Sequence, residues 1–416
     1  MRPDVVRFTT DNYNRQRTKI MQFIDLAVQQ KRIKEKIDAN IAAILAHGKY
    51  IMGPEIGILE KRLADYVGVG HAIGCASGTD ALLMALLAKQ IGPGDAVFTS
   101  PFTFIATAEV LSLLGATPVF VDIDPQTFNI DPGKLQSAIQ ALVNNDPLKH
   151  PLPATTSAPV SPTTALKPKG IMAVDLFGLP ADYNRIDTIA GEHGLFVIED
   201  AAQSFGAALN GKMACSFGSI GCTSFFPAKP LGGYGDGGMC FTDDGQLAEI
   251  MGSLRVHGKG HHKYDNVRIG VNGRLDTIQA GILLAKFDIF PEEIELRQQV
   301  AKRYTAMLNP LANIETPAIP QGYKSAWAQY SILAAGDKQR TDLQNKLKEA
   351  DIPTAIYYPK PLHLQSAFSY LGYKKGDFPI SEDISRRIFS LPMHPYLTEE
   401  EQQKIAEVIG KKNGCF

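Results

Sequence analysis

The sequence predicts an α/β protein in which a large domain holds a mostly parallel sheet and a smaller α+β domain follows it. From about residue 70 to residue 250, short β-rich runs alternate with helical segments, and this spacing predicts parallel strands covered by helices on both faces. After about residue 265 the chain changes to longer charged helices with short β-rich pieces, and its 416 residues allow two or three domains. We therefore expect an N-terminal extension over 1–20, a large domain over 21–265 and a small C-terminal domain over 266–416.

The expected elements of the large domain follow one another in regular order. The helix expected at 79–90 carries Leu82 and Leu86, and also Leu83 and Leu87, at the i,i+4 spacing of a buried face. Ligands of such sheets bind at the carboxyl ends of the strands. The expected strands cover 71–77, 95–100, 117–124, 170–178 and 195–204, and the expected helices cover 79–90, 104–116 and 182–194.

Two parts of the chain depart from this alternation. Residues 147–168 contain six prolines among Ala, Thr and Ser, a composition that does not pack a core, so we expect an extended surface insertion there. The small domain is expected to contain charged helices at 291–308, 340–350 and 398–410, with a β-rich segment at 327–335.

The overall composition is that of an ordinary globular protein with no excess of either charge. Apolar residues make up 44% of the chain, and 42 basic residues balance 43 acidic ones to a net charge of -1. This balance gives no reason to expect nucleic acid or a membrane surface as a partner. The five cysteines form no CxxC pair, so we expect a cytoplasmic, reduced protein without structural zinc or another bound metal.

The start of the chain carries no clear targeting segment. Residues 1–20 lack the apolar core of a signal peptide, and no apolar run in the chain approaches the roughly 20 residues that span a bilayer. Four arginines in this segment leave a transit peptide open. The better alternative takes Met21 as the true start and residues 1–20 as a tail.

The first candidate functional segment, Ser77-Gly78-Thr79-Asp80, lies between an expected strand and an expected helix. Small residues let the backbone approach a ligand closely, and the first N–H groups of a helix favour an anion there. The alternative is a plain N-cap with Ser77 or Thr79 as the capping residue, which is favoured when the segment is taken alone.

Two charged residues follow at the ends of apolar runs. Asp200 ends a hydrophobic strand, where its carboxylate could keep a heterocyclic nitrogen protonated or could equally be the structural partner of a loop. Lys229 lies in the Gly- and Pro-rich segment 224–238. A lysine on a surface loop is usually solvated, but apolar neighbours would lower its pKa and make it a Schiff-base nucleophile.

The glycines after Lys229 match GxGxxG by letter between Gly233 and Gly238. A dinucleotide fingerprint follows a strand and opens a helix, whereas these glycines lead into the strand-like run MCFTD. We therefore reject the nucleotide interpretation. We expect flexible glycines that give Lys229 room to move between a cofactor and a substrate.

The order of these signals is more specific than any one of them. An anion site at a helix start, an aspartate at a strand end and a lysine in the next loop match the phosphate, the pyridine nitrogen and the aldehyde of pyridoxal 5'-phosphate. The sequence thus indicates a site for this cofactor, with Lys229 as the attachment point.

The sequence resembles the DegT/DnrJ/EryC1/StrS family of sugar aminotransferases, a branch of the fold-type I pyridoxal-phosphate enzymes. The resemblance covers nearly the whole chain from Met21. It rests on the motifs ASGTDALLMAL, PFTFIATAEVL, PVFVDID, VIEDAAQSFGA, TSFFPAKPLGGYGDGG and VNGRLDTIQAGIL. It implies transamination with L-glutamate as the expected donor. Some relatives replace the lysine by histidine and dehydrate sugars, so the lysine at 229 favours transamination.

The resemblance also implies roles for individual residues around the cofactor ring. Lys229 corresponds to the lysine that holds the cofactor as a Schiff base and shuttles a proton. Asp200 corresponds to the carboxylate beside the pyridine nitrogen, and Gln203 to an amide near the ring hydroxyl. Phe104 falls where the family keeps an aromatic ring stacked on the cofactor.

A second set of residues corresponds to the phosphate binders of the family. Gly78 and Thr79 match its backbone donors, and Ser224 matches the hydroxyl that joins them. Asn272 matches a residue that the neighbouring subunit supplies to the phosphate. The resemblance therefore implies a homodimer with shared active sites.

The substrate is implied by similarity to one subgroup of the family. The run 270–298 is similar to enzymes that aminate C3 of a UDP-linked 3-keto-N-acetylglucosamine uronic acid for bacterial surface polysaccharide. Arg274 could bind the sugar carboxylate in a bidentate fork or could form an interface salt bridge. His363 aligns with a histidine near the active site, and Tyr357 stands where many relatives have histidine.

Three alternatives to this substrate and function remain open. The chain could act on a 4-keto-6-deoxy nucleotide sugar, or belong with lysine-retaining relatives of antibiotic and cyclitol pathways. It could also be a regulatory protein that binds pyridoxal phosphate without turnover, although no appended DNA-binding segment or basic patch is visible.

Overall fold

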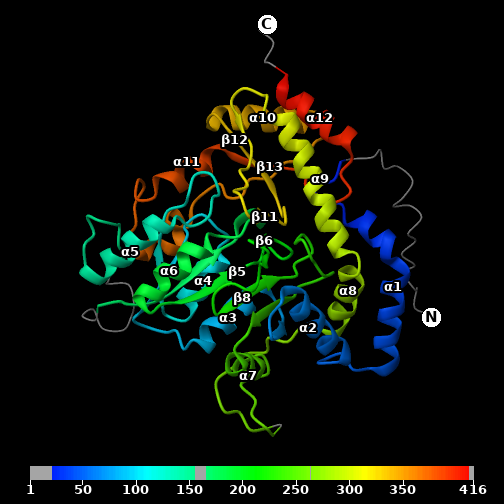
Figure 1. Cartoon of the computed structure of the whole chain (residues 1–416), viewed down its shortest axis with the longest axis vertical. Coiled ribbons are helices and arrows are strands. Elements are labelled where there is room, and N and C mark those ends of the chain that lie inside the picture. The colour runs from blue at the N-terminus through cyan, green and yellow to red at the C-terminus, as the bar shows by residue number, and fades with distance from the viewer. Residues whose placement is uncertain (1–20, 155–164, 263, 412–416) are drawn as a thin grey trace, which may run out of the picture.

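The computed structural model describes residues 21–154, 165–262 and 264–411 (Figure 1). The expected extension over 1–20 and the centre of the proline-rich insertion lie outside these residues. None of the helices in the described ranges is long and apolar enough to cross a bilayer.

A seven-stranded sheet forms the centre of the large domain, in the order β1-β9-β8-β5-β4-β2-β3. The pairs β2–β3, β2–β4, β4–β5 and β5–β8 are parallel, and β9 joins β8 and β1 antiparallel. The expectation of a mostly parallel sheet is therefore confirmed. The strands are β1 (His71–Cys75), β2 (Asp95–Thr99), β3 (Thr117–Phe120), β4 (Lys167–Val174), β5 (Phe196–Asp200), β8 (Ile220–Ser224) and β9 (Gly238–Thr242).

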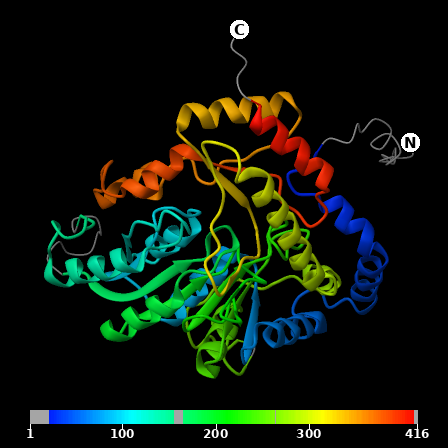
Figure 2. The same cartoon turned by 45° about the horizontal axis from the view of Figure 1, so that its top comes forward.

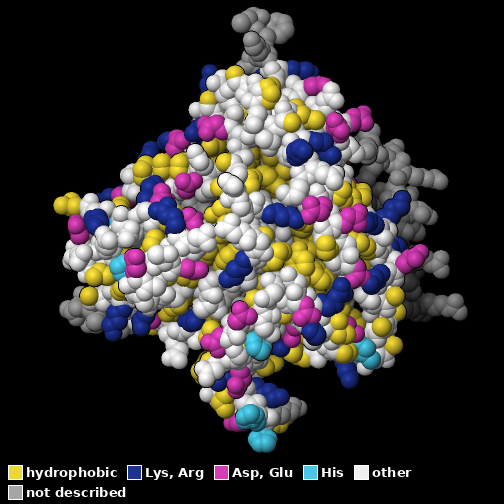
Figure 3. Space-filling model, viewed as in Figure 1, with side chains coloured by type: hydrophobic (Ala, Val, Ile, Leu, Met, Phe, Trp, Pro, Cys, Tyr) yellow, Lys and Arg dark blue, Asp and Glu magenta, His cyan; other side chains and the backbone are white. Residues whose placement is uncertain are grey.

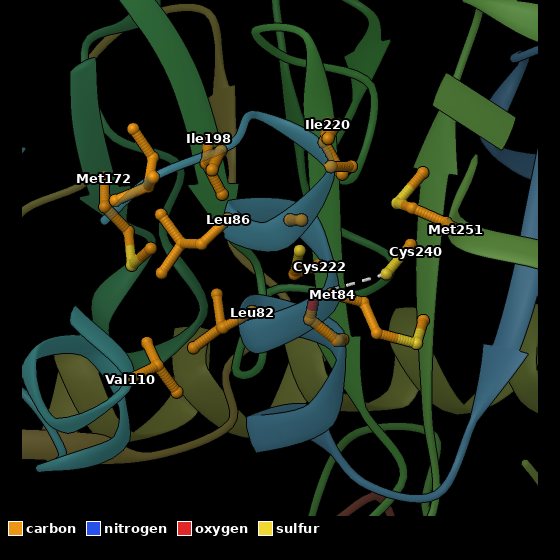
Figure 4. Close-up of a cluster of buried hydrophobic side chains, with 14 of the residues drawn as sticks. Leu82, Met84, Leu86, Val110, Met172, Ile198, Ile220, Cys222, Cys240 and Met251 are labelled. Atoms are coloured by element: carbon orange, nitrogen blue, oxygen red, sulfur yellow. Dashed lines mark hydrogen bonds between the residues drawn. The ribbon is translucent and has the colours of Figure 1, made fainter. Parts of the chain in front are cut away.

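Helices cover both faces of this sheet. Successive strand residues point to opposite faces, and in β5 Val197 and Ile198 belong to two different buried clusters. Figure 4 shows the cluster around α3, where Leu82 and Leu86 meet Ile198 from the sheet. The helices of the large domain are α2 (Pro54–Val67), α3 (Gly78–Ala88), α4 (Ala106–Leu113), α5 (Pro132–Asn144), α6 (Tyr183–His193) and α7 (Gly245–Leu254), with a 3-10 turn at Leu176–Gly178.

The C-terminal part of the chain forms a separate three-stranded antiparallel sheet, β10-β12-β13, packed with helices. Its core contains Tyr304, Tyr330, Ile332 and Ile405, together with Met21 from the start of the described chain. The elements are α9 (Phe290–Leu308), β10 (Ile314–Glu315), β12 (Tyr330–Ala334), α10 (Asp337–Glu349), α11 (Pro379–Arg387), β13 (Ile388–Leu391) and α12 (Glu399–Gly410), with 3-10 turns at Leu362–Leu364 and Ser366–Leu371.

Two further features join the domains. Helix α1 (Leu26–His47) lies beside α8 (Thr277–Phe287) (Figure 2). Ile33, Ile37 and Ile282 belong to one buried cluster between these helices. Helix α8 also packs into the large-domain core, so the proposed boundary at 265/266 places an element of that core in the small domain. A three-stranded sheet of β6 (Ala208–Leu209), β7 (Lys212–Met213) and β11 (Tyr323–Lys324) links both parts of the chain.

The described ends of the proline-rich insertion are held by the fold. The ring Nε2 of His150 donates to the Phe120 carbonyl at 2.8 Å, and the amide of Ala154 donates to the Leu371 carbonyl at 2.8 Å. Lys167 and Pro168, the last two residues of the expected insertion, belong to β4.

Side chains of both charges are mixed over the face of the molecule in Figure 3.

Candidate active site

A cavity of about 620 Å³ opens at the carboxyl ends of β5 and β8. This is the edge where parallel sheets bind ligands, and the volume is that of a small-molecule site. The lining residues come from seven separate segments of the sequence. They are Ser77, Gly78, Thr79, Leu82, Thr103, Phe104, Ala106, Thr107, Val174, Asp200, Ala202, Gln203, Ser224, Phe226, Ala228, Lys229, Asp236, Gln329, Tyr357 and Tyr358.

The N-terminus of α3 supplies the first wall of the cavity. Ser77 is the N-cap, because its Oγ accepts the Asp80 amide at 3.0 Å. The capping interpretation is thus confirmed for Ser77. The cap leaves the amides of Gly78 and Thr79 without an acceptor inside the helix, since the first N–H groups of a helix have none. The same turn can therefore be capped and also bind an anion.

Ser224 approaches this helix start from the end of β8. A Cβ atom on Gly78 would lie 2.7 Å from the Ser224 Cβ, closer than side chains pack. Position 78 therefore requires glycine, and the Ser224 hydroxyl stands beside the two free amides. This cradle of backbone N–H groups and a hydroxyl suits a phosphate.

Asp200 ends β5 in the floor of the cavity and is only 5% exposed. Its Oδ2 accepts a hydrogen bond of 2.8 Å from the Thr107 hydroxyl, and its Oδ1 accepts one of 3.3 Å from the Ala202 amide. Burial raises the pKa of the Asp200 carboxyl, and these hydrogen bonds and the charge of Lys229 oppose that rise. A cation in the cavity would therefore favour the ionised form of this carboxyl.

Lys229 reaches the same cavity from the loop between β8 and β9, where its amide donates to the Phe226 carbonyl at 2.9 Å. Burial lowers the pKa of the Lys229 amine, and the charge of Asp200 opposes this shift. A lowered pKa increases the share of neutral amine, the nucleophilic form.

The glycines of this loop are closely packed. A Cβ on Gly233 or on Gly235 would lie 2.8 Å from the Gln279 amide group, and one on Gly232 would lie 2.5 Å from the Pro227 carbonyl oxygen. The expectation that they give Lys229 freedom to move therefore finds no support, because they serve close approach to α8. The loop leads into strand β9 at Gly238, as expected when the nucleotide fingerprint was rejected.

Gln203 and Phe104 also line the cavity, as expected. Gln203 Oε1 accepts the Phe177 amide at 2.7 Å, and its Nε2 donates to the Tyr358 hydroxyl at 3.1 Å. The Phe104 ring is 55% exposed and lies 6.5 Å from the Tyr358 ring, measured between centroids. Tyr357, noted in place of a histidine, contributes to the wall beside Tyr358.

Three expected site residues do not line the cavity of this chain. Asn272 is exposed and forms a bridge opposite Val256, and Arg274 lies opposite Cys75, with its buried Nε lacking a partner among the described residues. His363 is buried, with its Nε2 3.1 Å from Glu382 Oε1 and its ring 4.8 Å from that of Phe378. The position of His363 is that of a packed core histidine and lends no support to substrate contact.

Several cavity residues were not singled out from the sequence. They are Thr103, Ala106, Thr107, Val174, Ala202, Phe226, Ala228, Asp236, Gln329 and Tyr358. Thr103 lies before α4 and Thr107 lies in its first turn, so helical spacing does not link the two hydroxyls and the sequence carried no signal for them. No group of three or more His, Cys, Asp or Glu side chains in the described ranges could hold a metal ion.

The fold and the lysine–carboxylate site are those of a pyridoxal-phosphate enzyme. Residues 31–410 match the model of the DegT/DnrJ/EryC1/StrS aminotransferase family. The chain belongs to this family.

Two relatives and two solved structures show how broad the similarity is. The chain is 47% identical over 378 residues to UDP-2-acetamido-2-deoxy-3-oxo-D-glucuronate aminotransferase from Pseudomonas aeruginosa, covering 91% of this chain and 96% of that protein. It is 41% identical over 390 residues to a pleiotropic regulatory protein from Geobacillus stearothermophilus, covering 93% and 97%.

The solved structures agree with the family. A DegT/DnrJ/EryC1/StrS aminotransferase from Brucella abortus superposes with a TM-score of 0.86 at 50% identity, covering 94% of this chain and 98% of that one. NtdA from Bacillus subtilis, crystallised with the cofactor PMP, superposes with a TM-score of 0.79 at 29% identity, covering 95% and 85%. The expected fold of the family is therefore confirmed.

Proposed function

We propose that the chain transfers an amino group to the keto carbon of UDP-2-acetamido-2-deoxy-3-oxo-glucuronate, with L-glutamate as donor. The observation that carries the transfer chemistry is the presence of Lys229 and Asp200 in one cavity beside the N-terminus of α3. The choice of sugar is supported by the 47% identity to the Pseudomonas enzyme. The amino sugar would enter surface polysaccharide.

Pyridoxal 5'-phosphate is the cofactor, and the cavity residues fit it. The Gly78 and Thr79 amides and the Ser224 hydroxyl would hold the phosphate, in a cradle that a side chain on Gly78 would fill. Asp200 would face the ring nitrogen and Gln203 the ring hydroxyl. Phe104 would stack on the ring. When bound, the cofactor supplies an electron sink for the bond broken at the amino-bearing carbon.

Asp200 and Lys229 have different roles in the proposed reaction. An ionised Asp200 would stabilise positive charge on the ring nitrogen of the cofactor, because opposite charges in a buried site attract strongly. Lys229 Nζ takes up a proton and returns it, and its lowered pKa favours the neutral amine that accepts the proton. Such proton transfer typically contributes about 10²- to 10⁴-fold to the rate.

The protein is proposed to act as a homodimer in which Asn272 and Arg274 serve the partner's site. Lys229 is the only cationic side chain among the described residues that line the cavity, so the anionic groups of a uronic acid or glutamate need further cations. The proposed dimer is also supported by large apolar side chains that are exposed on α1, on the turn after it and on the loop before α8. They include Leu45, Tyr50, Ile51, Met52, Tyr264, Val267 and Ile269.

Mixing two inactive variants tests the dimer. Lys229→Ala subunits and Asn272→Ala subunits should regain activity when combined, because a hybrid dimer contains one intact site. Lys229→Ala subunits mixed with a second preparation of themselves provide the control. A fully active monomer by light scattering would contradict the shared site.

A cytoplasmic location remains a proposal, supported by the buried free thiols of Cys75, Cys215, Cys222 and Cys240.

The substrate proposal is tested by direct turnover. Purified holoenzyme is incubated with glutamate and either the UDP-linked 3-keto uronic acid or a 4-keto-6-deoxy nucleotide sugar, and the amino sugar is detected by mass spectrometry. Faster turnover of the first supports the proposal, and faster turnover of the second transfers the assignment to that sugar class. The similarity to the Geobacillus regulatory protein favours a second candidate, binding without turnover, which applies if neither sugar reacts while the cofactor is bound.

A further inference from the structure

Two threonine hydroxyls form a short chain that ends on Asp200. Thr107 Oγ1 lies 2.8 Å from Asp200 Oδ2, and Thr103 Oγ1 lies 3.1 Å from Thr107 Oγ1. All three side chains are at most 5% exposed. Thr107 is the second residue of α4, Thr103 precedes this helix, and the carboxylate ends β5, so the contacts join two elements at the floor of the cavity.

The donor directions along this chain follow from the charge of Asp200. An ionised carboxylate only accepts hydrogen bonds, so Thr107 donates to Asp200 and is free to accept from Thr103. Each hydroxyl in such a chain polarises the next and strengthens the bond to the carboxylate. A protonated Asp200 would lose this arrangement on the oxygen that carries the proton.

The sequence makes this arrangement rigid. Thr103 lies in the turn before α4 and Thr107 lies in the first turn of α4, so their two hydroxyls meet at the start of the helix. A β-branched side chain has few χ1 rotamers in a helix, which limits the positions that the Thr107 hydroxyl can take. The other Asp200 oxygen accepts only the longer 3.3 Å bond from Ala202 among the described residues. Thr107 is therefore the main side-chain contact that orients the carboxylate.

We propose that Thr107 is a positioning residue that holds the Asp200 carboxylate charged and oriented toward the ring nitrogen of the cofactor, with Thr103 orienting Thr107. This rests on the proposed function, because Asp200 must face that nitrogen. The competing explanation is that Thr107 only ties α4 to β5 as a packing contact.

The test compares Thr107→Val, Thr107→Ser and Thr99→Val in the purified holoenzyme. Valine keeps the shape of threonine without the hydroxyl, whereas serine keeps the hydroxyl. Thr99 is a matched control, since it is fully buried on β2 of the same sheet and donates to the Met172 carbonyl at 2.9 Å, but does not line the cavity. The measurements are the cofactor dissociation constant and the pH at which ring-¹⁵N-labelled cofactor loses its ring proton, followed by NMR.

Thr107→Val is expected to weaken cofactor binding about tenfold or more, because a hydrogen bond to a charged group is lost. The ring nitrogen should also lose its proton at lower pH. Thr107→Ser should restore most of both properties, and Thr99→Val should change neither. Wild-type affinity and ring titration in Thr107→Val, with a loss of thermal stability equal to that of Thr99→Val, would overturn the proposal.

Failure of the positioning role and failure of the proposed function would give different results in this test. Failure of the wild-type protein to bind the cofactor would refute the proposed function itself, whereas normal binding with an unaffected Thr107→Val refutes only the positioning role. If Thr107→Val does not fold, Thr103→Val is measured instead, because it removes only the hydrogen bond between Thr103 and Thr107. The pH at which the ring nitrogen loses its proton should then shift in the same direction by a smaller amount. An unchanged titration in Thr103→Val would then count against the chain of hydroxyls.

Discussion

The backbone amide of Tyr234 donates a 2.8 Å hydrogen bond to Oε1 of Gln279, which ties the loop after Lys229 to helix α8. The Gln279 side chain also fills the space beside Gly233 and Gly235. The loop that carries the reactive lysine is thus held by a helix that the chain reaches some forty residues later.

Removing this contact should loosen the loop. Gln279→Ala is expected to lower the free energy of unfolding by about 1–3 kcal/mol, because the Tyr234 amide loses its acceptor in a partly buried site. Cofactor affinity should fall with it. Gln279→Glu retains an acceptor and should lie closer to wild type. Urea unfolding and equilibrium dialysis measure both effects, and unchanged affinity in Gln279→Ala would show that the loop does not depend on this contact.

Covalent attachment of the cofactor should be confined to Lys229. The purified protein should absorb in the visible range, and borohydride treatment followed by peptide mapping should place the reduced cofactor on this residue. Lys286 is the internal control, because burial lowers the pKa of its amine to about 8 but it lies outside the cavity. Lys229→Ala should bind the cofactor only non-covalently and lose transamination. Label on any other lysine would refute the assignment.

The close approach of Gly78 to Ser224 predicts that a second substitution restores stability but not cofactor affinity. Gly78→Ala places a methyl group 2.7 Å from the Ser224 Cβ and should cost about 1–3 kcal/mol of stability as an overpacked site. Adding Ser224→Gly removes the clashing atom and should restore thermal stability. Cofactor affinity should stay low in the double variant, because the phosphate has lost the hydroxyl. Full recovery of both properties would contradict a phosphate-binding role for Ser224.

Arg274→Ala should mainly harm the reaction with the uronic acid. If the guanidinium binds the sugar carboxylate, a loss of about 10- to 100-fold in catalytic efficiency is expected for this substrate. Cofactor binding and the half-reaction with the donor should change much less. Single-turnover measurement of each half-reaction separates the cases, and an equal loss in both would indicate a structural or donor-binding arginine.

His394 predicts a loss of stability in mild acid. Burial and the charge of Arg297 lower the pKa of this histidine to about 4, although Asp25 and Glu401 oppose the shift. The unfolded chain, with an ordinary histidine pKa near 6.5, therefore binds the proton more readily, and stability falls as pH drops below about 6.5. The full effect is about 3 kcal/mol at pH 4.

His394→Gln should flatten part of this dependence in urea unfolding at pH 5 and pH 7. A residual slope is expected from His150 and His363, whose pKa values are also lowered by burial. An identical slope in wild type and variant would mean that His394 does not titrate as described.

The sequence predicted those site residues that stand at positions with a recognisable local sequence pattern. Asp200 and Gly78 stand at a strand end and a helix start, which hydrophobic periodicity locates, and Lys229 lies in a loop that its glycines and prolines mark. Thr107 and Gln279 carry no such mark, because a threonine in an apolar helix and a glutamine in an amphipathic one are ordinary residues. Their contacts with Asp200 and Tyr234 cross the sequence and arise only from the packing of α4 and α8. The buried state of His363 likewise depends on Phe378 and Glu382, which no local pattern links to it.

Met21 packs in the core of the small domain with Tyr304, Tyr330 and Ile405, and the Met393 amide bonds to the Phe23 carbonyl at 3.1 Å. The earliest and latest parts of the described chain thus complete one hydrophobic core. During synthesis on the ribosome, the segment around Met21 must wait for α12 to emerge before it can be buried. Contacts this distant in sequence close late and slow the folding of a chain. A fragment cut at the domain boundary would lack part of its own interior.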